Sequence, residues 1–261
     1  MSAERDNSDD FNYDSVADRY ARRVDSAPYN AHYERPAMLA TLDRLPSIRG
    51  RRVLDAGCGT GWYAAQLLAR GARVAGIDGS KRMLSYARAR FGRQTWGGGG
   101  GGAASDDGLL LAAGDLSSAL PFRSASFEVV VSPLVLHYIR DWTPALSELA
   151  RVLIPGGRLV FSTHHPAHEA QRLAADGFAV RYDEIQLVEE EWEEIGQVRF
   201  FRRSLMSITD ALAEAGFVME RLVEPVPTDA FRAAKPEAYA RLLERPEFLI
   251  VQARRDPDGV A

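Results

Sequence analysis

Short apolar runs alternate with amphipathic segments through the middle of the chain. The amphipathic segments have helical spacing, and residues that favour helix ends border them, such as Gly71 after one segment and Ser80 before the next. Strands that alternate with helices in this way favour a parallel, doubly wound sheet. The pattern predicts strands over residues 51–56, 73–78, 109–113, 127–132 and 158–163, and helices over residues 61–70, 80–90 and 143–153.

The later part of the chain continues this pattern after an interruption. Residues 166–203 contain three short segments with strand character, 179–182, 185–188 and 197–202, around an acidic run at 189–194 that is typical of a solvated face. We interpret them as a small antiparallel β insertion that caps a substrate. Beyond the insertion, the pattern predicts a helix over 204–215, a strand over 217–223, a helix near 237–243 and a strand over 247–253.

Three further segments lie outside the sheet pattern. Residues 1–12 are polar and acidic, and we expect a disordered tail there. Residues 13–48 are helical in pieces and carry several tyrosines, so we expect an N-terminal helical lid. Residues 92–108 include an unbroken run of glycines and are expected to form a flexible loop. The remaining chain, residues 49–261, is then one α/β domain.

Composition and charge narrow the class of protein. The formal net charge of −4 gives no electrostatic drive toward nucleic acid or an acidic membrane. The single cysteine, Cys58, cannot form an internal disulfide, which fits a reducing compartment. The polar start is unlike a secretory signal, and no apolar run approaches the roughly 20 residues of a membrane span. We therefore expect a cytoplasmic monomer or homodimer with no nucleic-acid partner and no membrane partner.

The candidate chemistry lies in a glycine-rich turn where the first strand meets the first helix. Ligands of open α/β sheets bind at this edge, and glycine lets them approach the backbone. A dinucleotide motif would need a small residue where Trp62 stands, and no phosphate-binding loop is present. Asp55 places a carboxylate beside the turn, which suits a cationic group. Asp78, at the end of the second strand, can accept two ribose hydroxyls.

This turn resembles motif I of the class I S-adenosylmethionine (SAM) dependent methyltransferases, in particular the small-molecule group called methyltransferase type 11. The motif reads Val53-Leu54-Asp55-Ala56-Gly57-Cys58-Gly59-Thr60-Gly61. The resemblance continues in register over residues 50–165. It implies SAM as the cofactor and a Rossmann-like, doubly wound, seven-stranded sheet, mostly parallel with an antiparallel last strand. The further matching segments are residues 76–80, 114–116, 120–122, 126–132, 136–138 and 153–159.

The resemblance also implies roles for particular residues. Around the methionine part of SAM it places three glycines, Asp55 near the amino group, and Ser132. Around the nucleoside it places Asp78 on the ribose, Asp115 on the adenine amine, and three residues beside the base. It further suggests two tyrosines and an arginine that close over SAM, the arginine facing its carboxylate. The three glycines are Gly57, Gly59 and Gly61. The residues beside the base are Gly79, Met83 and Leu116, and the residues that close over SAM are Tyr20, Tyr29 and Arg35.

Histidines are the candidates for a catalytic base. His137 follows the fourth strand, and His164 and His165 follow the fifth, so all three reach the expected ligand edge. A base near neutral pKa would help to deprotonate an acceptor, although methyl transfer can also proceed by alignment alone. For His137, packing or hydrogen bonding under the substrate pocket is the favoured interpretation, and catalysis is the alternative. His168 adds a third neighbouring histidine, but without evident carboxylate partners we predict no metal site.

These observations predict a SAM-dependent methyltransferase that acts on an oxygen, nitrogen or carbon atom of a small-molecule acceptor. The lid and the insertion would enclose that acceptor. No Asn/Asp-Pro-Pro-Tyr signature follows the fourth strand, which disfavours a DNA or protein-amide target. Two alternatives remain open: a SAM-using cyclase or lyase on the same fold, and a non-catalytic SAM-binding module. A third, an NAD-dependent oxidoreductase, is disfavoured by Trp62.

Overall fold

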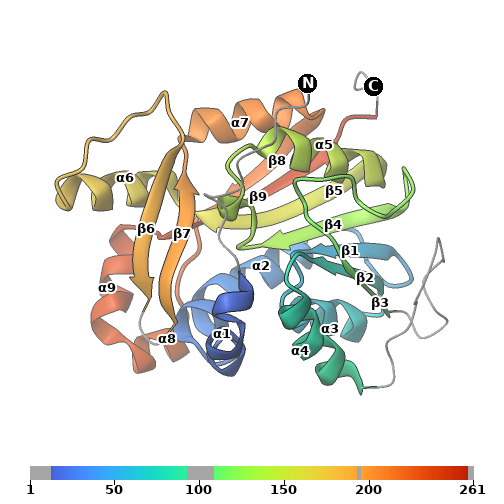
Figure 1. Ribbon diagram of the computed structural model, residues 1–261, viewed down its shortest axis with the longest axis horizontal. Helices are drawn as coiled ribbons and strands as arrows, with labels where there is room; N and C mark the ends of the chain where they lie inside the picture. The colour runs from blue at the N-terminus through green and yellow to red at the C-terminus, as the bar shows by residue number, and fades with distance from the viewer. Residues whose placement is uncertain (1–12, 93–108, 193–194, 258–261) are drawn as a thin grey trace.

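The structure is a computed structural model that describes residues 13–92, 109–192 and 195–257. Its centre is a seven-stranded sheet with the order β3-β2-β1-β4-β5-β9-β8 (Figure 1). Strand β9 runs antiparallel to its neighbours β5 and β8, whereas the pairs from β3 to β5 are parallel. This confirms the predicted doubly wound sheet with an antiparallel last strand. The strands are β1 Arg52–Ala56, β2 Arg73–Asp78, β3 Leu109–Ala113, β4 Phe127–Pro133, β5 Leu153–His164, β8 Phe217–Val223 and β9 Phe248–Arg255.

Helices cover both faces of this sheet (Figure 1). On one face α5 (Trp142–Val152) and α7 (Leu205–Glu214) pack onto Leu54, Val130 and Phe161 of the central strands. On the other face α2, α3 and α4 cover a second apolar cluster. Strands buried on both faces must be apolar throughout, which explains their unbroken Val-rich and Leu-rich runs. The helices of the second face are α2 Arg35–Leu42, α3 Trp62–Ala69 and α4 Lys81–Phe91.

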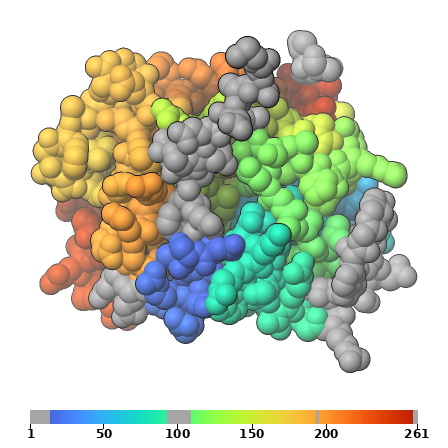
Figure 2. All heavy atoms as spheres, in the orientation of Figure 1, coloured from blue at the N-terminus to red at the C-terminus, as the bar shows by residue number. Residues whose placement is uncertain are grey.

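The N-terminal part is helical in pieces, as the sequence predicts. It contains η2 (Tyr13–Ser15), α1 (Ala17–Arg23) and the π-helix η3 (Asn30–Glu34), which leads into α2. Helix α1 lies beside α4, across the carboxyl ends of the strands (Figures 1 and 2). The tail predicted at residues 1–12 and nearly all of the loop predicted at 92–108 lie outside the described residues.

The insertion differs in part from its prediction. It begins with a helix, α6 (Pro166–Ala175), where the sequence pattern showed only strands. Residues 179–182 form no strand, and the two-stranded antiparallel sheet pairs β6 (Gln186–Trp192) with β7 (Gly196–Arg202). The first three glutamates of the acidic run belong to β6. The end of the run, residues 193–194, lies outside the described residues.

The C-terminal part adds two helices between β8 and β9. Helix α9 (Pro236–Glu244) matches its prediction, whereas α8 (Asp229–Ala234) was not predicted. Helix α8 places Phe231 against Tyr33 of the N-terminal part, so the two ends of the chain share a small apolar cluster. None of the described helices is long and apolar enough to cross a membrane.

Candidate functional site

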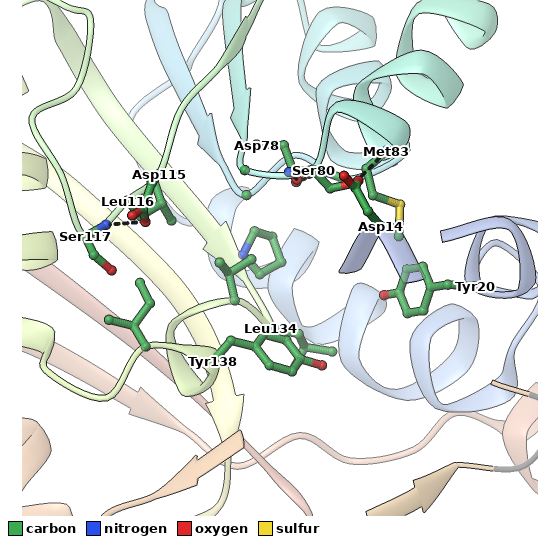
Figure 3. A pocket seen from close by; sticks show the side chains of 16 residues that line it. Asp14, Tyr20, Asp78, Ser80, Met83, Asp115, Leu116, Ser117, Leu134 and Tyr138 are labelled. Carbon is green, nitrogen blue, oxygen red and sulfur yellow. Dashed lines mark hydrogen bonds between the residues drawn. The ribbon is translucent and has the colours of Figure 1, made fainter. Parts of the chain in front are cut away.

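A cavity of about 540 Å³ opens at the carboxyl ends of β1 to β4 (Figure 3). The N-terminal part, the turns after these strands and the start of α4 contribute its walls. This is the edge at which open α/β sheets bind ligands. The lining residues are Asp14, Tyr20, Gly57, Gly59, Asp78, Gly79, Ser80, Met83, Asp115, Leu116, Ser117, Pro133, Leu134, Val135, Tyr138 and Ile139.

The glycine turn folds back against the end of β2. The amides of Gly57 and Cys58 donate to Ile77 O at 2.8 and 2.9 Å, and Gly57, Gly59 and Gly61 all have positive φ angles. Gly57 and Gly59 face the cavity, whereas Gly61 begins α3 and packs against Phe91. Glycine is needed because L side chains rarely adopt this conformation. The turn therefore brings bare backbone to the cavity wall.

Asp78 ends β2 and organises the turn next to it. Its carboxylate accepts hydrogen bonds from the amides of Gly59, at 2.7 Å, and Ser80, at 2.8 Å. Burial raises the pKa of Asp78, and these two amides oppose the rise by favouring the charged form. The carboxylate also faces the cavity, so it can accept hydrogen bonds from a ligand carrying neighbouring hydroxyls.

Asp55 is buried behind the glycine turn without a compensating charge. It is fully inaccessible, and neither carboxylate oxygen meets hydrogen-bond geometry with a described residue. Burial raises the pKa of Asp55 to about 7, the charge of Asp78 adds to the rise, and the Ala64 amide opposes it. Ser132, on the neighbouring strand, donates to Ala56 O at 3.0 Å and keeps that wall closed. A buried carboxylate without a partner is costly, and a bound cation would relieve it.

The far end of the cavity has room for a flat apolar group. Met83 and Leu116 provide apolar walls, and Gly79 lies close to the backbone of Gly114. Asp115 turns its carboxylate toward the Ser117 amide, which donates to it at 2.8 Å (Figure 3). The sequence assigned a base-binding role to four of these six residues, Gly79, Met83, Asp115 and Leu116, and all four line the cavity.

The N-terminal part closes one side of the cavity with Asp14 and Tyr20 (Figure 3). Asp14 accepts a hydrogen bond from Ser80, the N-cap of α4. Asp18 pairs with Arg82 of α4 and accepts from the Tyr86 hydroxyl at 2.6 Å. These contacts dock α1 on α4, and Figure 2 shows the two helices in contact on this face.

Asp25 extends the same docking surface at the end of α1. It pairs with Arg90 of α4 and with Arg35. Arg35 is buried, stacks on Trp62 with its Cζ 4.0 Å from the ring centre, and donates to Asp25 O at 3.0 Å. Tyr29 packs against Phe231, and its hydroxyl accepts from Arg241 at 2.8 Å. Neither Arg35 nor Tyr29 is among the residues that line the cavity.

None of the three candidate histidines is among the residues that line the cavity, and two of them stack on each other. The rings of His137 and His164 lie 4.2 Å apart at 18°, and His137 also contacts Tyr138, which lines the cavity. Burial lowers the pKa of both histidines, so both rings are neutral near pH 7. His164 Nδ1 lies 3.6 Å from a carboxylate oxygen of Glu169. Neither nitrogen of His137 has a hydrogen-bond partner among the described residues.

His165 has a different setting. Its Nδ1 accepts from the Ala167 amide at 3.2 Å and thereby caps α6, and its Nε2 lies 3.2 Å from Glu224. Both ring nitrogens are therefore engaged within the protein. In the described part of the chain, no group of three His, Cys, Asp or Glu residues is arranged to hold a metal ion.

Several lining residues were absent from the site predicted from sequence. Asp14 and Ser80 form a hydrogen bond although 66 positions separate them in sequence, and no local pattern predicts such a contact. Leu134 adopts a positive φ of 52°, which is rare for a leucine and carries no sequence signal. Tyr138 adjoins the predicted His137, and it is the tyrosine that faces the cavity.

Known proteins share this sequence and architecture. A family model described as a methyltransferase domain matches residues 54–161. Malonyl-[acyl-carrier protein] O-methyltransferases of Erwinia billingiae and Erwinia pyrifoliae are 32% and 36% identical to this chain over 152 residues. Each match covers 58% of this chain and 54% or 52% of the relative, so the chain spans about half the length of these curated relatives.

A solved structure matches the chain more fully. The S-adenosylmethionine dependent methyltransferase from Mesorhizobium loti is 30% identical with a TM-score of 0.63, and the match covers 89% of this chain and all of that one. The chain belongs to the SAM-dependent methyltransferase family. The range matched by the family model includes the glycine turn, Asp55 in β1 and Asp78 at the end of β2.

Proposed function

We propose that this methyltransferase binds SAM in the cavity and transfers its methyl group to a small-molecule acceptor. The observation that carries the proposal is Asp55. Its carboxylate is buried behind a turn of bare backbone, neither oxygen meets hydrogen-bond geometry with a described residue, and only the Ala64 amide opposes the rise of its pKa. The α-ammonium group of SAM is a cation of suitable size to pair with it, directly or through water.

The remaining contacts follow from the lining of the cavity. Asp78 would accept the two ribose hydroxyls, and Gly57 and Gly59 would lie along the methionine part with Ser132 behind them. Asp115, Gly79, Met83 and Leu116 would surround adenine. Tyr20 would cover the cofactor from the N-terminal side. Arg35 would leave its present partner, Asp25, and face the carboxylate of SAM. In this proposal Gly61 and Tyr29 support the walls without touching SAM.

Bound SAM supplies an activated methyl group on a positively charged sulfur. An electron pair of the acceptor would form the new bond to the methyl carbon, the electrons of the broken carbon–sulfur bond would stay on sulfur, and SAH would leave. The chain contributes alignment of the two reactants and exclusion of water. Tyr20, Leu134 and Tyr138 lie around the opening where acceptor and cofactor would meet (Figure 3). A cavity of about 540 Å³ that holds the cofactor leaves space for a small acceptor.

For an acceptor that loses a proton, we propose His164 as the base. Its neutral ring can take up a proton, and the nearby carboxylate of Glu169 would stabilise the resulting charge. His165 is less suited, because capping α6 and pairing with Glu224 occupy both of its nitrogens. His137 is nearly inaccessible and is better placed to support the His164 ring through stacking.

The experiment that tests this function is product analysis. The purified protein is incubated with methyl-labelled SAM and a panel of phenols, amines and carboxylic acids, and the products are separated by mass spectrometry. The proposal predicts S-adenosylhomocysteine (SAH) together with a labelled acceptor. Adenosine-containing products other than SAH, formed from SAM alone, would instead support a cyclase or lyase.

A further inference from the structure

The carboxylate of Glu34 joins the N-terminal part to the strands of the sheet. Glu34 ends the π-helix η3 and is only 1% exposed. One carboxylate oxygen accepts from the Tyr63 hydroxyl at 2.7 Å, and the other accepts from Ser162 Oγ at 2.6 Å. Burial raises the pKa of this carboxyl, and the two hydroxyl donors oppose the rise. π-Helical turns often occur at functional positions, and this one places an acid at the end of β5.

Ser162 connects Glu34 to Leu134, which lines the cavity. Its Oγ accepts a hydrogen bond from the Leu134 amide at 3.0 Å, and its main-chain oxygen accepts from the same amide at 3.0 Å. A serine hydroxyl has a single hydrogen. Because Glu34 takes that hydrogen, the lone pairs of Ser162 Oγ face the Leu134 amide. A continuous chain of hydrogen bonds therefore runs from Leu134 through Ser162 to Glu34.

The backbone conformation of Leu134 is unfavourable and needs stabilising contacts. Its φ of 52° lies in the left-handed region, which a leucine occupies only at a cost in free energy. The conformation matters for the site, because the next residue, Val135, lies in direct contact with Gly57 of the glycine turn. Both Leu134 and Val135 line the cavity, and Figure 3 shows Leu134 at its wall.

We propose that Glu34 is a positioning residue that fixes the Leu134 turn through the Ser162 hydroxyl and thereby shapes the methionine end of the SAM site. Glu34 does not line the cavity, and it acts through Ser162. The N-terminal part would thus contribute to cofactor binding in two ways: Asp14 and Tyr20 line the cavity, and Glu34 supports its wall through Ser162. The role of Glu34 in cofactor binding rests on the proposed function. Its effect on the hydrogen bond of the Leu134 amide does not.

A matched pair of variants separates this role from general support. Tyr63→Phe and Ser162→Ala each remove one hydroxyl from Glu34, but only the second breaks the link to Leu134. Hydrogen exchange of the Leu134 amide and calorimetric titration with SAH are measured for both. We expect Ser162→Ala to speed exchange of that amide about fivefold, the effect of one lost hydrogen bond, and to weaken SAH binding at least threefold. Tyr63→Phe should change both by less than twofold.

Glu34→Ala tests the same link from its other end. It should speed exchange of the Leu134 amide as Ser162→Ala does, while amides of β1 to β3 keep their wild-type rates. Wild-type exchange at Leu134 in either variant, or equal acceleration throughout the sheet, overturns the positioning role. Equal SAH affinity in Ser162→Ala and wild type overturns its part in the cofactor site. Failure of the wild-type protein to bind SAH is a separate result, and it would refute the proposed function.

Discussion

Val135 lies directly over Gly57. A Cβ atom on Gly57 would stand 2.7 Å from Val135 Cγ1, closer than real carbon atoms approach, and Gly57 has a φ of 78°. The glycine is therefore required twice, once by its backbone conformation and once by the side chain opposite. This contact joins the turn after β1 to the turn after β4, and both turns line the cavity beside the proposed methionine site of SAM.

Gly57→Ala should lower the free energy of unfolding by about 2–4 kcal/mol, because strain and overpacking add. The matched control is Gly216→Ala, which has a φ of 75° but nothing within 4 Å of the added carbon. Denaturant titration of both variants separates the two contributions, since the control should lose only about 1–2 kcal/mol. Equal losses in the two variants would show that the contact with Val135 is unimportant.

The affinity for SAM should depend on pH through Asp55. Its pKa is raised to about 7 in the free protein, and an ammonium group favours the charged carboxylate. SAM binding should therefore release a proton, and affinity should fall by up to tenfold per pH unit below about pH 7. Calorimetry in buffers of different ionisation enthalpy measures that proton. In Asp55→Asn the dependence near neutral pH should vanish and binding should weaken.

The stability of the free protein should show the opposite dependence on pH. A folded-state pKa raised from 3.8 to about 7 means that Asp55 favours folding while protonated and loses that contribution as pH rises from about 4 through 7. Asp55→Asn cannot ionise, so above pH 8 it should melt at a higher temperature than the wild type. At pH 5 the difference should shrink. A variant that is less stable than the wild type at both pH values contradicts this interpretation of the buried carboxyl.

Asp78→Ala should weaken SAM binding by about 1.5–3 kcal/mol, through loss of the acceptor for the ribose hydroxyls. It also releases the amides of Gly59 and Ser80, so the glycine turn should loosen. The control is Asp43→Ala, which removes an exposed ion pair with Arg70 far from the cavity. Isothermal titration with SAH provides the measurement. Unchanged affinity in Asp78→Ala would remove the ribose assignment.

If the acceptor loses a proton in the reaction, His164→Ala should reduce turnover about 10²–10⁴-fold, the usual contribution of a general base. His165→Ala should act mainly on stability, because it removes the cap of α6. Steady-state rates and melting temperatures for the two variants distinguish these roles. Comparable turnover in His164→Ala and the wild type would mean that methyl transfer proceeds by alignment alone.

The sheet and the cofactor edge could be predicted because their signals are local. Apolar runs of strand length, the glycine turn and Asp78 are each recognisable within a few residues, and the structure brings these residues to one edge. Helix α6 was missed although Pro166 stands at its first position, where proline is favoured, because its N-cap is His165, a residue type that seldom signals a helix start. His164 and His165 could be placed at the ligand edge because the fifth strand was predicted to end at Thr163, directly before them.

Contacts between distant segments could not be predicted. The contact of Asp14 with Ser80 and the contact of Glu34 with Ser162 depend on how the N-terminal part docks, which no periodicity encodes. The positive φ of Leu134 follows from its hydrogen bonds and not from its residue type. Tyr29 likewise lies where α8 and α9 pack, and a single sequence gives no sign of that neighbour.

Calorimetric titration of the purified protein with SAM and with SAH, at pH 8 where Asp55 is ionised, tests the central claim most directly. We expect saturable binding of both compounds at one site, strongly weakened in Asp55→Asn, and no binding of NAD. Absence of saturable binding by the wild-type protein, or binding that is indifferent to the charge of Asp55, would contradict it.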